Sequence, residues 1–77
     1  MTTEKTEQVM KEVFILDSSL EINPVQVSLT EWEHPSGYFG AMIDGRPITA
    51  FRHGWSKTTT YAGFETRQEA EEFRNLL

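Results

Sequence analysis

A two-residue Asp44-Gly45 step between two apolar stretches is the feature that most limits what this chain can fold into. Asp-Gly between alternating apolar residues predicts a tight β-hairpin, because both central residues of the preferred turn need positive φ. Residues 38–43 and 46–53 then form its two strands, and pairing across the pleat assigns their side chains to two faces. One face carries Ile43 with Arg46, Ala41 with Ile48, and Phe39 with Ala50; the other carries Tyr38 with Phe51, Gly40 with Thr49, and Met42 with Pro47.

Further strands are predicted on both sides of this hairpin. Residues 12–17 contain the run Val13-Phe14-Ile15-Leu16, which is rich in β-branched and aromatic side chains and predicts a short strand. In residues 25–29, apolar and polar side chains alternate as in a half-buried strand. Trp32 breaks that alternation, so it lies on the opposite face or a bulge shifts the register. The β-favouring threonines in residues 57–63 predict one more strand.

A C-terminal helix is predicted from residue 67 onward. Thr66 and Glu69 have the spacing of a capping box, in which each side chain bonds the backbone amide of the other residue. Ala70, Phe73 and Leu77 follow at helical spacing and form one apolar stripe. We expect this stripe to cover the core face of the sheet, including Phe39 and Phe64.

These elements predict an α+β fold: a small antiparallel sheet of three to four strands, one C-terminal helix packed on one face, and a flexible or helical N-terminal arm. We assign residues 1–11 to the arm and residues 12–77 to a single domain. The chain has 77 residues and no cysteine. It therefore has a thin core that neither a disulfide nor a cysteine-ligated zinc ion can stabilise.

Residue patterns that would indicate an enzyme are missing from the sequence. The two histidines, His34 and His53, lie at predicted turns, and no hydrolase, zinc-protease or phosphate-binding spacing accompanies them. We therefore expect no catalytic residues, no metal and no cofactor. No apolar run approaches the ~20 residues that span a bilayer, and the first residues lack a signal-peptide pattern, so we expect a cytoplasmic protein without membrane contact.

Aromatic residues exceed what one helix can cover, which favours a binding surface. Residues 51–64 hold two bases, a histidine and four aromatics, although the whole chain carries 12 acids against 7 bases. An uncovered aromatic face of a small sheet often marks an interaction site; the alternative is that the N-terminal segment folds over it. The predicted partner-binding residues are Trp55, Tyr38, Phe51, Tyr61 and Trp32.

The acidic side chains offer a second binding surface, for a basic partner. Their other explanation is that they keep a small domain soluble. The members of this surface are Glu4, Glu7, Glu12, Asp17, Glu21, Glu31, Glu33, Glu69, Glu71 and Glu72. Our leading hypothesis is a non-enzymatic, protein-binding regulatory module that uses the aromatic face or the acidic surface. Homodimerisation stays open as a further option, because one face of the sheet has no predicted cover.

The strands and capped helix of residues 37–77, ending in the run from Tyr61 to Phe73, resemble small sheet-plus-helix DNA-binding domains of the AP2 type and of integrase arm-binding domains. A similar strand-to-helix ending occurs in the hybrid-binding domain of ribonuclease H. The resemblance implies that the sheet enters the major groove and that basic or aromatic strand residues contact the DNA. The candidate contacts in this chain are the bases Arg46, Arg52 and Lys57, together with Trp55. A net charge of −5 departs from those families, because neutralising several phosphates needs a dense row of bases. DNA binding through the sheet is therefore the alternative hypothesis.

Overall fold

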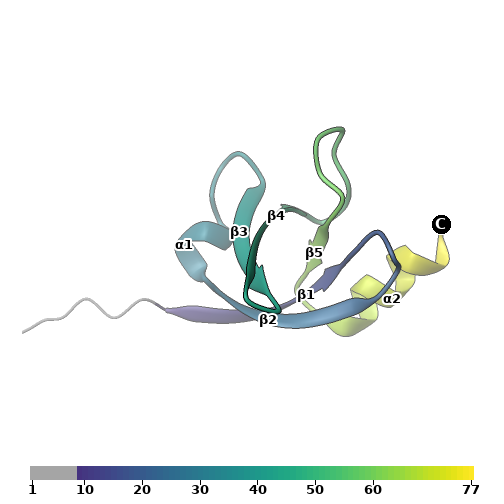
Figure 1. Cartoon of the computed structure of the whole chain (residues 1–77), viewed down its shortest axis with the longest axis horizontal. Helices are drawn as coiled ribbons and strands as arrows, with labels where there is room; N and C mark the ends of the chain where they lie inside the picture. The colour runs from purple at the N-terminus through teal and green to yellow at the C-terminus, as the bar shows by residue number, and fades with distance from the viewer. Residues whose placement is uncertain (1–8) are drawn as a thin grey trace, which may run out of the picture.

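The computed structural model describes residues 9–77, which form a five-stranded, nearly closed barrel-like sheet with a C-terminal helix (Figure 1). In chain order the elements are β1 (Met10–Leu16), β2 (Ile22–Ser28), α1 (Leu29–Trp32), β3 (Tyr38–Ile43), β4 (Arg46–Arg52), β5 (Ala62–Phe64) and α2 (Arg67–Asn75). The strand order in the sheet is β2-β1-β5-β4-β3. The α+β class agrees with the prediction, but the sheet has five strands where three to four were expected. The first eight residues of the predicted arm lie outside the described part, and its last two, Met10 and Lys11, belong to β1.

The hairpin of β3 and β4 has the register that the sequence predicted. Ile43 pairs with Arg46 and Tyr38 with Phe51 at the two ends of the ladder. Asp44 and Gly45 have φ values of 52° and 76°, as the tight hairpin turn requires. Phe39 and Ala50 are buried on the inner face, which confirms the predicted division between the two faces.

β1 lies inside the sheet, and its second half, residues 13–16, is covered on both faces. Val13 and Ile15 belong to a first core cluster with Trp32 and Phe39, whereas Leu16 belongs to a second cluster beneath α2. Because successive side chains of a strand point to opposite faces, a strand with two covered faces is apolar at every position. This explains the continuous apolar run of residues 13–16.

The predicted strand over residues 57–63 is wrong in length and direction. Only Ala62–Phe64 form β5, which pairs antiparallel with β1 and parallel with β4, where an antiparallel sheet was expected. Before it, the Thr59 hydroxyl donates a hydrogen bond to the Thr49 carbonyl (2.9 Å) and accepts one from the Tyr61 amide (3.3 Å). A threonine side chain thus bonds backbone groups that a strand partner would otherwise bond.

The short helix α1 was not predicted and places Trp32 in the core. The Ser28 hydroxyl accepts a hydrogen bond from the Glu31 amide (3.1 Å) and so caps the helix. The change from strand to helix turns Trp32 inward, where its ring meets the Phe39 ring edge-on at 5.1 Å. The loss of alternation at this tryptophan therefore reflects a helix and not a bulge.

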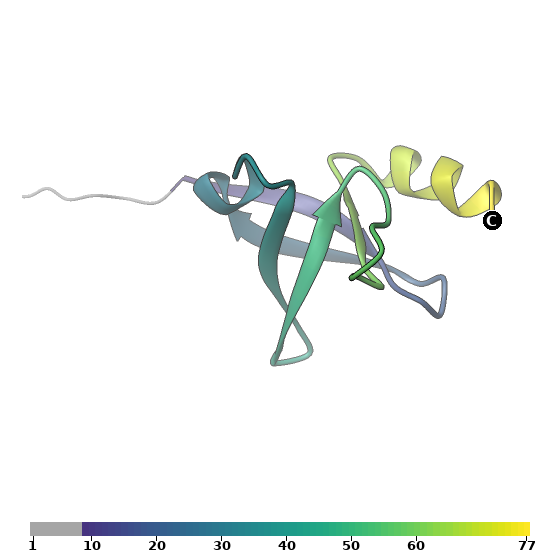
Figure 2. The same ribbon diagram turned by 90° about the horizontal axis from the view of Figure 1, so that it is seen from above.

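α2 begins at Arg67, and both hydrogen bonds of the predicted Thr66–Glu69 capping box are present. It packs against β1 and β5 (Figure 2). Ala70 is buried there with Leu16, Ala62 and Phe64. Two details differ from the prediction. Trp32, and not the helix, covers Phe39, and the helix ends at Asn75, so that Leu77 lies beyond it and is 60% exposed.

Candidate functional site

The outer face of the β3–β4 hairpin is the sheet surface that the helices leave open. We define it by the residues Tyr38, Gly40, Met42, Pro47, Thr49 and Phe51. α2 packs against β1 and β5, away from this hairpin (Figure 2), and Met42 is 56% exposed. Tyr38 and Phe51 are partly buried, and their rings meet edge-on at 5.0 Å. The face is thus an aromatic pair continued by exposed apolar and small polar side chains.

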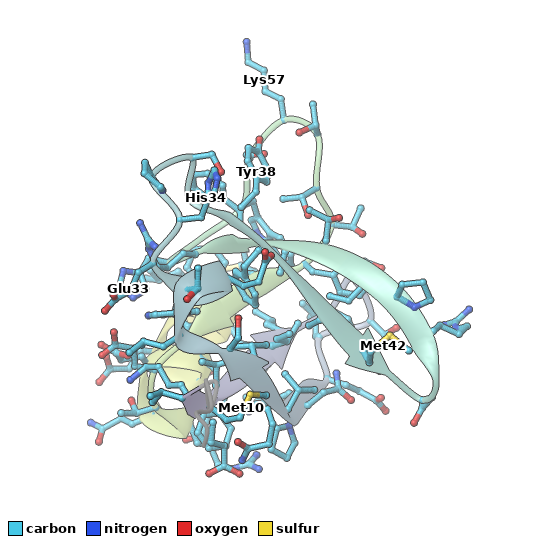
Figure 3. All side chains as sticks on the ribbon, turned by 90° about the vertical axis from the view of Figure 1, so that its left-hand side faces the viewer. Met10, Glu33, His34, Tyr38, Met42 and Lys57 are labelled. Carbon is cyan, nitrogen blue, oxygen red and sulfur yellow. The ribbon has the colours of Figure 1, made fainter. Side chains whose placement is uncertain are left out.

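The β4–β5 loop holds Tyr38 in place. The Tyr38 hydroxyl lies 2.5 Å from the Ser56 Oγ and 3.0 Å from the Thr58 Oγ1. These two hydrogen bonds, Ser56 first, lower the pKa of Tyr38 below its usual 10.0. Lys57 lies at the tip of the same loop and points outward above Tyr38, whereas Met42 lies toward the other end of the hairpin (Figure 3).

The free edge of β3 is occupied by side chains of the same chain. Two of its outward amides, those of Tyr38 and Gly40, donate to the Ser36 hydroxyl (3.1 Å) and the Glu31 carboxylate (3.1 Å). An edge strand with satisfied amides is a poor template for an added strand. A partner of this region would therefore contact the side chains of the outer face and would not extend the sheet.

Trp55, which belongs to the same β4–β5 loop, lines a pocket. Its ring meets the Phe73 ring of α2 edge-on at 5.7 Å, which leaves it partly buried. The pocket is an open hollow of about 320 Å³, and its lining residues are Ser18, Leu20, Trp55, Thr59, Thr60 and Leu77. The segments that form it are the β1–β2 loop, the β4–β5 loop and the end of α2, which gather at one end of the molecule (Figure 1).

The five predicted partner-binding aromatics do not form one surface. Tyr38 and Phe51 share the outer face as expected, whereas Trp55 belongs to the β4–β5 loop and packs against Phe73 of α2. Trp32 is 3% exposed, and Tyr61 packs against the first core cluster, where the opposite face of the sheet was expected. These two side chains contribute to the core.

The three predicted DNA-contacting bases are not brought together either. Arg52 donates a hydrogen bond to the Trp32 carbonyl, and its guanidinium lies 5.9 Å from the Trp32 ring centre. Arg46 is at the turn end of β4, which is about 20 Å away at ~3.3 Å per strand residue. Lys57 stands apart in the loop.

Several acidic side chains have local structural partners. Asp17 accepts the amides of Ser19 and Glu21 in the β1–β2 loop. Glu65 accepts a hydrogen bond from the Trp32 indole (3.3 Å), and Glu31 bonds β3 as described above. Glu4 and Glu7 of the predicted acidic surface lie outside the described residues. Among residues 9–77, no three histidine, aspartate or glutamate side chains gather closely enough to hold a metal ion.

Sequence reasoning missed most of the pocket. Leu20 is its clearest unforeseen member, because it has a φ of 68° at the end of the Asp17–Leu20 turn. Glycine is the usual residue at such a position, but the leucine itself gives no sign of it, because the φ angle is known only from the structure. Ser18 and Thr60 carry no sequence signal either. Neither helix in the described part of the chain has the length and apolarity that a membrane crossing needs.

Comparisons of the chain with protein-family models, with curated proteins and with solved structures return no match.

Proposed function

We propose that this protein is a non-enzymatic, protein-binding regulatory module that uses the outer face of the β3–β4 hairpin. The observation that carries the proposal is the Tyr38–Phe51 pair, whose rings are held 5.0 Å apart on a face that α2 leaves open. Aromatic rings provide large, rigid contact area with little loss of side-chain entropy, and they are enriched in the centres of protein interfaces.

The arrangement of charge supports a protein partner over DNA. Arg52 is already bonded to the Trp32 carbonyl, and Arg46 and Lys57 lie at separate places on the hairpin and loop. Phosphate binding gains affinity from each neutralised charge, so a dispersed set of three bases on a chain of net charge −5 provides little. The outer face itself presents apolar and hydroxyl side chains.

The proposal is tested by comparing what the wild type and two matched variants retain from an extract of the source cell. Met42→Glu adds a carboxylate to the exposed outer face, and Gln26→Glu adds the same group to an exposed position of β2. Circular dichroism and thermal melting check that both variants fold. We expect one protein to bind the wild type and Gln26→Glu, to be lost with Met42→Glu, and to remain after nuclease treatment and at raised salt.

Two outcomes would contradict the proposal. If Met42→Glu retains the same protein as the wild type, the outer face is not the binding surface. If nuclease removes everything that was retained, and if binding falls steeply with salt, the protein binds nucleic acid instead.

A further inference from the structure

The Trp55 pocket and the outer face both involve the β4–β5 loop. Ser56 and Thr58 bond the Tyr38 hydroxyl on the outer face, whereas Trp55, Thr59 and Thr60 line the pocket. A partner that covers the outer face can therefore reach the pocket by crossing the β4–β5 loop. The pocket is concave, as small binding sites are, whereas the outer face is a sheet surface.

Leu20 is held in the pocket wall at a cost to stability. Its φ of 68° lies in the left-handed region, which is unfavourable for residues with a Cβ. Its side chain is 43% exposed, so burial within this chain offsets little of that cost. The turn is fixed around it by the Asp17 carboxylate, and Arg74 of α2 donates to the Leu20 carbonyl (3.4 Å). Backbone strain of this kind, kept in a site that a ligand can reach, points to binding.

The lining defines what the pocket can hold. Its side chains are three apolar ones (Leu20, Trp55, Leu77) and three hydroxyl-bearing ones (Ser18, Thr59, Thr60), and none is charged. A charged group would find no oppositely charged side chain among these lining residues. A volume of about 320 Å³ is at the small end of ligand sites, which suits one large side chain and not a cofactor.

We propose that the Trp55 pocket anchors one uncharged apolar side chain, leucine or phenylalanine in type, of the partner protein. This inference rests on the proposed function, because it identifies the part of the partner that enters the module. The exposed side chains of Leu20 and Leu77 form the apolar border of the pocket. The flanking partner segment lies over the β4–β5 loop and continues onto Tyr38.

The binding test uses amino-acid amides as probes and the two tryptophan indole N–H signals as reporters in ¹⁵N-labelled protein. N-acetyl-leucinamide and N-acetyl-phenylalaninamide are expected to shift the Trp55 signal saturably, with a Kd on the order of a millimolar. The Trp32 signal is an internal control, because that indole is buried and bonded to Glu65. N-acetyl-glycinamide and N-acetyl-lysinamide should leave both signals in place.

Leu20→Gly removes one wall of the pocket and also relieves the unfavourable φ, so this variant should melt no lower than the wild type. It is expected to weaken binding of the leucine and phenylalanine amides at least several-fold. Leu76→Ala is the matched control, because Leu76 is 82% exposed at the same end but does not line the pocket. The pocket assignment is overturned if the apolar amides shift Trp55 no more than glycinamide, or if Leu20→Gly binds them as the wild type does.

The capture assay separates this inference from the function on which it rests. If Met42→Glu loses the partner and Leu20→Gly keeps it at full affinity, the outer face binds the partner and the pocket is not an anchor. If Met42→Glu and Leu20→Gly both lose the partner and Leu76→Ala keeps it, the proposed function and the pocket assignment both stand. If Met42→Glu keeps the partner, the proposed function fails, and the amide titration still decides whether the pocket binds apolar side chains.

Discussion

Replacing Gly63 with alanine tests how closely the two aromatic rings of the first core cluster approach β5. Gly63 is buried, and the side of its Cα where a side chain would begin faces the Phe39 ring. A Cβ at this position would lie 2.7 Å from Phe39 Cε1, closer still to Phe39 Cζ, and 3.2 Å from Trp32 Cζ3. Carbon atoms in proteins pack at ~3.5–4.0 Å. The Phe39 ring would therefore have to retreat by about 1 Å.

The expected cost follows from the burial of the rings that would have to move. Phe39 is 1% exposed and Trp32 is 3% exposed, so neither ring has free space behind it. Overpacking of this kind typically costs ~1–3 kcal/mol, and the lower chain entropy of unfolded alanine returns ~0.4–1 kcal/mol. We expect Gly63→Ala to lower the free energy of unfolding by about 1–2 kcal/mol, or the Tm by about 4–8 °C for each kcal/mol.

The assay is denaturant and thermal unfolding of Gly63→Ala beside Gly40→Ala. Gly40 is also a strand glycine, but a Cβ there would meet the Glu31 carboxylate at 3.6 Å and the Ile48 carbonyl at 4.0 Å, which are ordinary contacts. We expect Gly40→Ala to stay within about 0.5 kcal/mol of the wild type. The difference between the two variants isolates the clash from the general effect of replacing a glycine.

A second substitution identifies the ring as the cause. Phe39→Leu removes the ring atoms that the new Cβ would meet, so it should cost less in the Gly63→Ala background than in the wild type, with a coupling of about 0.5–3 kcal/mol. The reasoning is refuted if Gly63→Ala is as stable as Gly40→Ala, or if the two substitutions at residues 39 and 63 are additive.

Three further predictions concern other contacts of the described residues. Glu31→Ala frees an outward amide of β3 and should give concentration-dependent self-association in sedimentation experiments. Glu33→Ala is the control and should behave like the wild type. If the two variants behave alike, the Glu31 carboxylate does not protect the edge of β3. Ser56→Ala should raise the pKa of Tyr38 in an ultraviolet titration. Since the folded-state pKa is lowered, the additional stability from the favoured phenolate is absent below that pKa, grows as pH rises and is complete above ~10. An unchanged titration of Ser56→Ala would refute the role of this bond. Thr66→Ala should cost about 0.5–2 kcal/mol in urea unfolding, and a loss near zero would mean that the cap is not needed.

The parts of the fold that depend on neighbouring residues were predictable from the sequence. The Asp44-Gly45 turn sets the register of β3 and β4, and the Thr66–Glu69 pair marks the start of α2, because both are short-range geometries with specific residue requirements. The outer face with Tyr38 and Phe51 follows from that register alone. The outer face, which is one of the two parts of the candidate site, was thus predictable from the sequence.

The parts that depend on distant segments were not predictable. β5 is three residues long and takes its place from pairing with β1 and β4, which no local pattern in residues 57–64 specifies. The run of threonines favoured a strand by propensity, but their hydroxyls bond nearby backbone groups instead. The Trp55 pocket joins three segments that are far apart in the sequence, so no local pattern predicted that they meet.

The place of β5 also bears on the order in which the molecule assembles. Each hairpin, β1–β2 and β3–β4, closes over a short loop and can form from local contacts, whereas β5 pairs with a strand from each hairpin and so needs both. Because long-range contacts carry a larger loop-closure cost, we expect the insertion of β5 to be the slow folding step. The Trp55 pocket is lined by the β1–β2 loop and the β4–β5 loop, which belong to the two parts of the sheet that β5 joins. A nascent or partly unfolded chain would therefore lack the pocket, and the ability to hold an apolar side chain would arise only with the final step of folding.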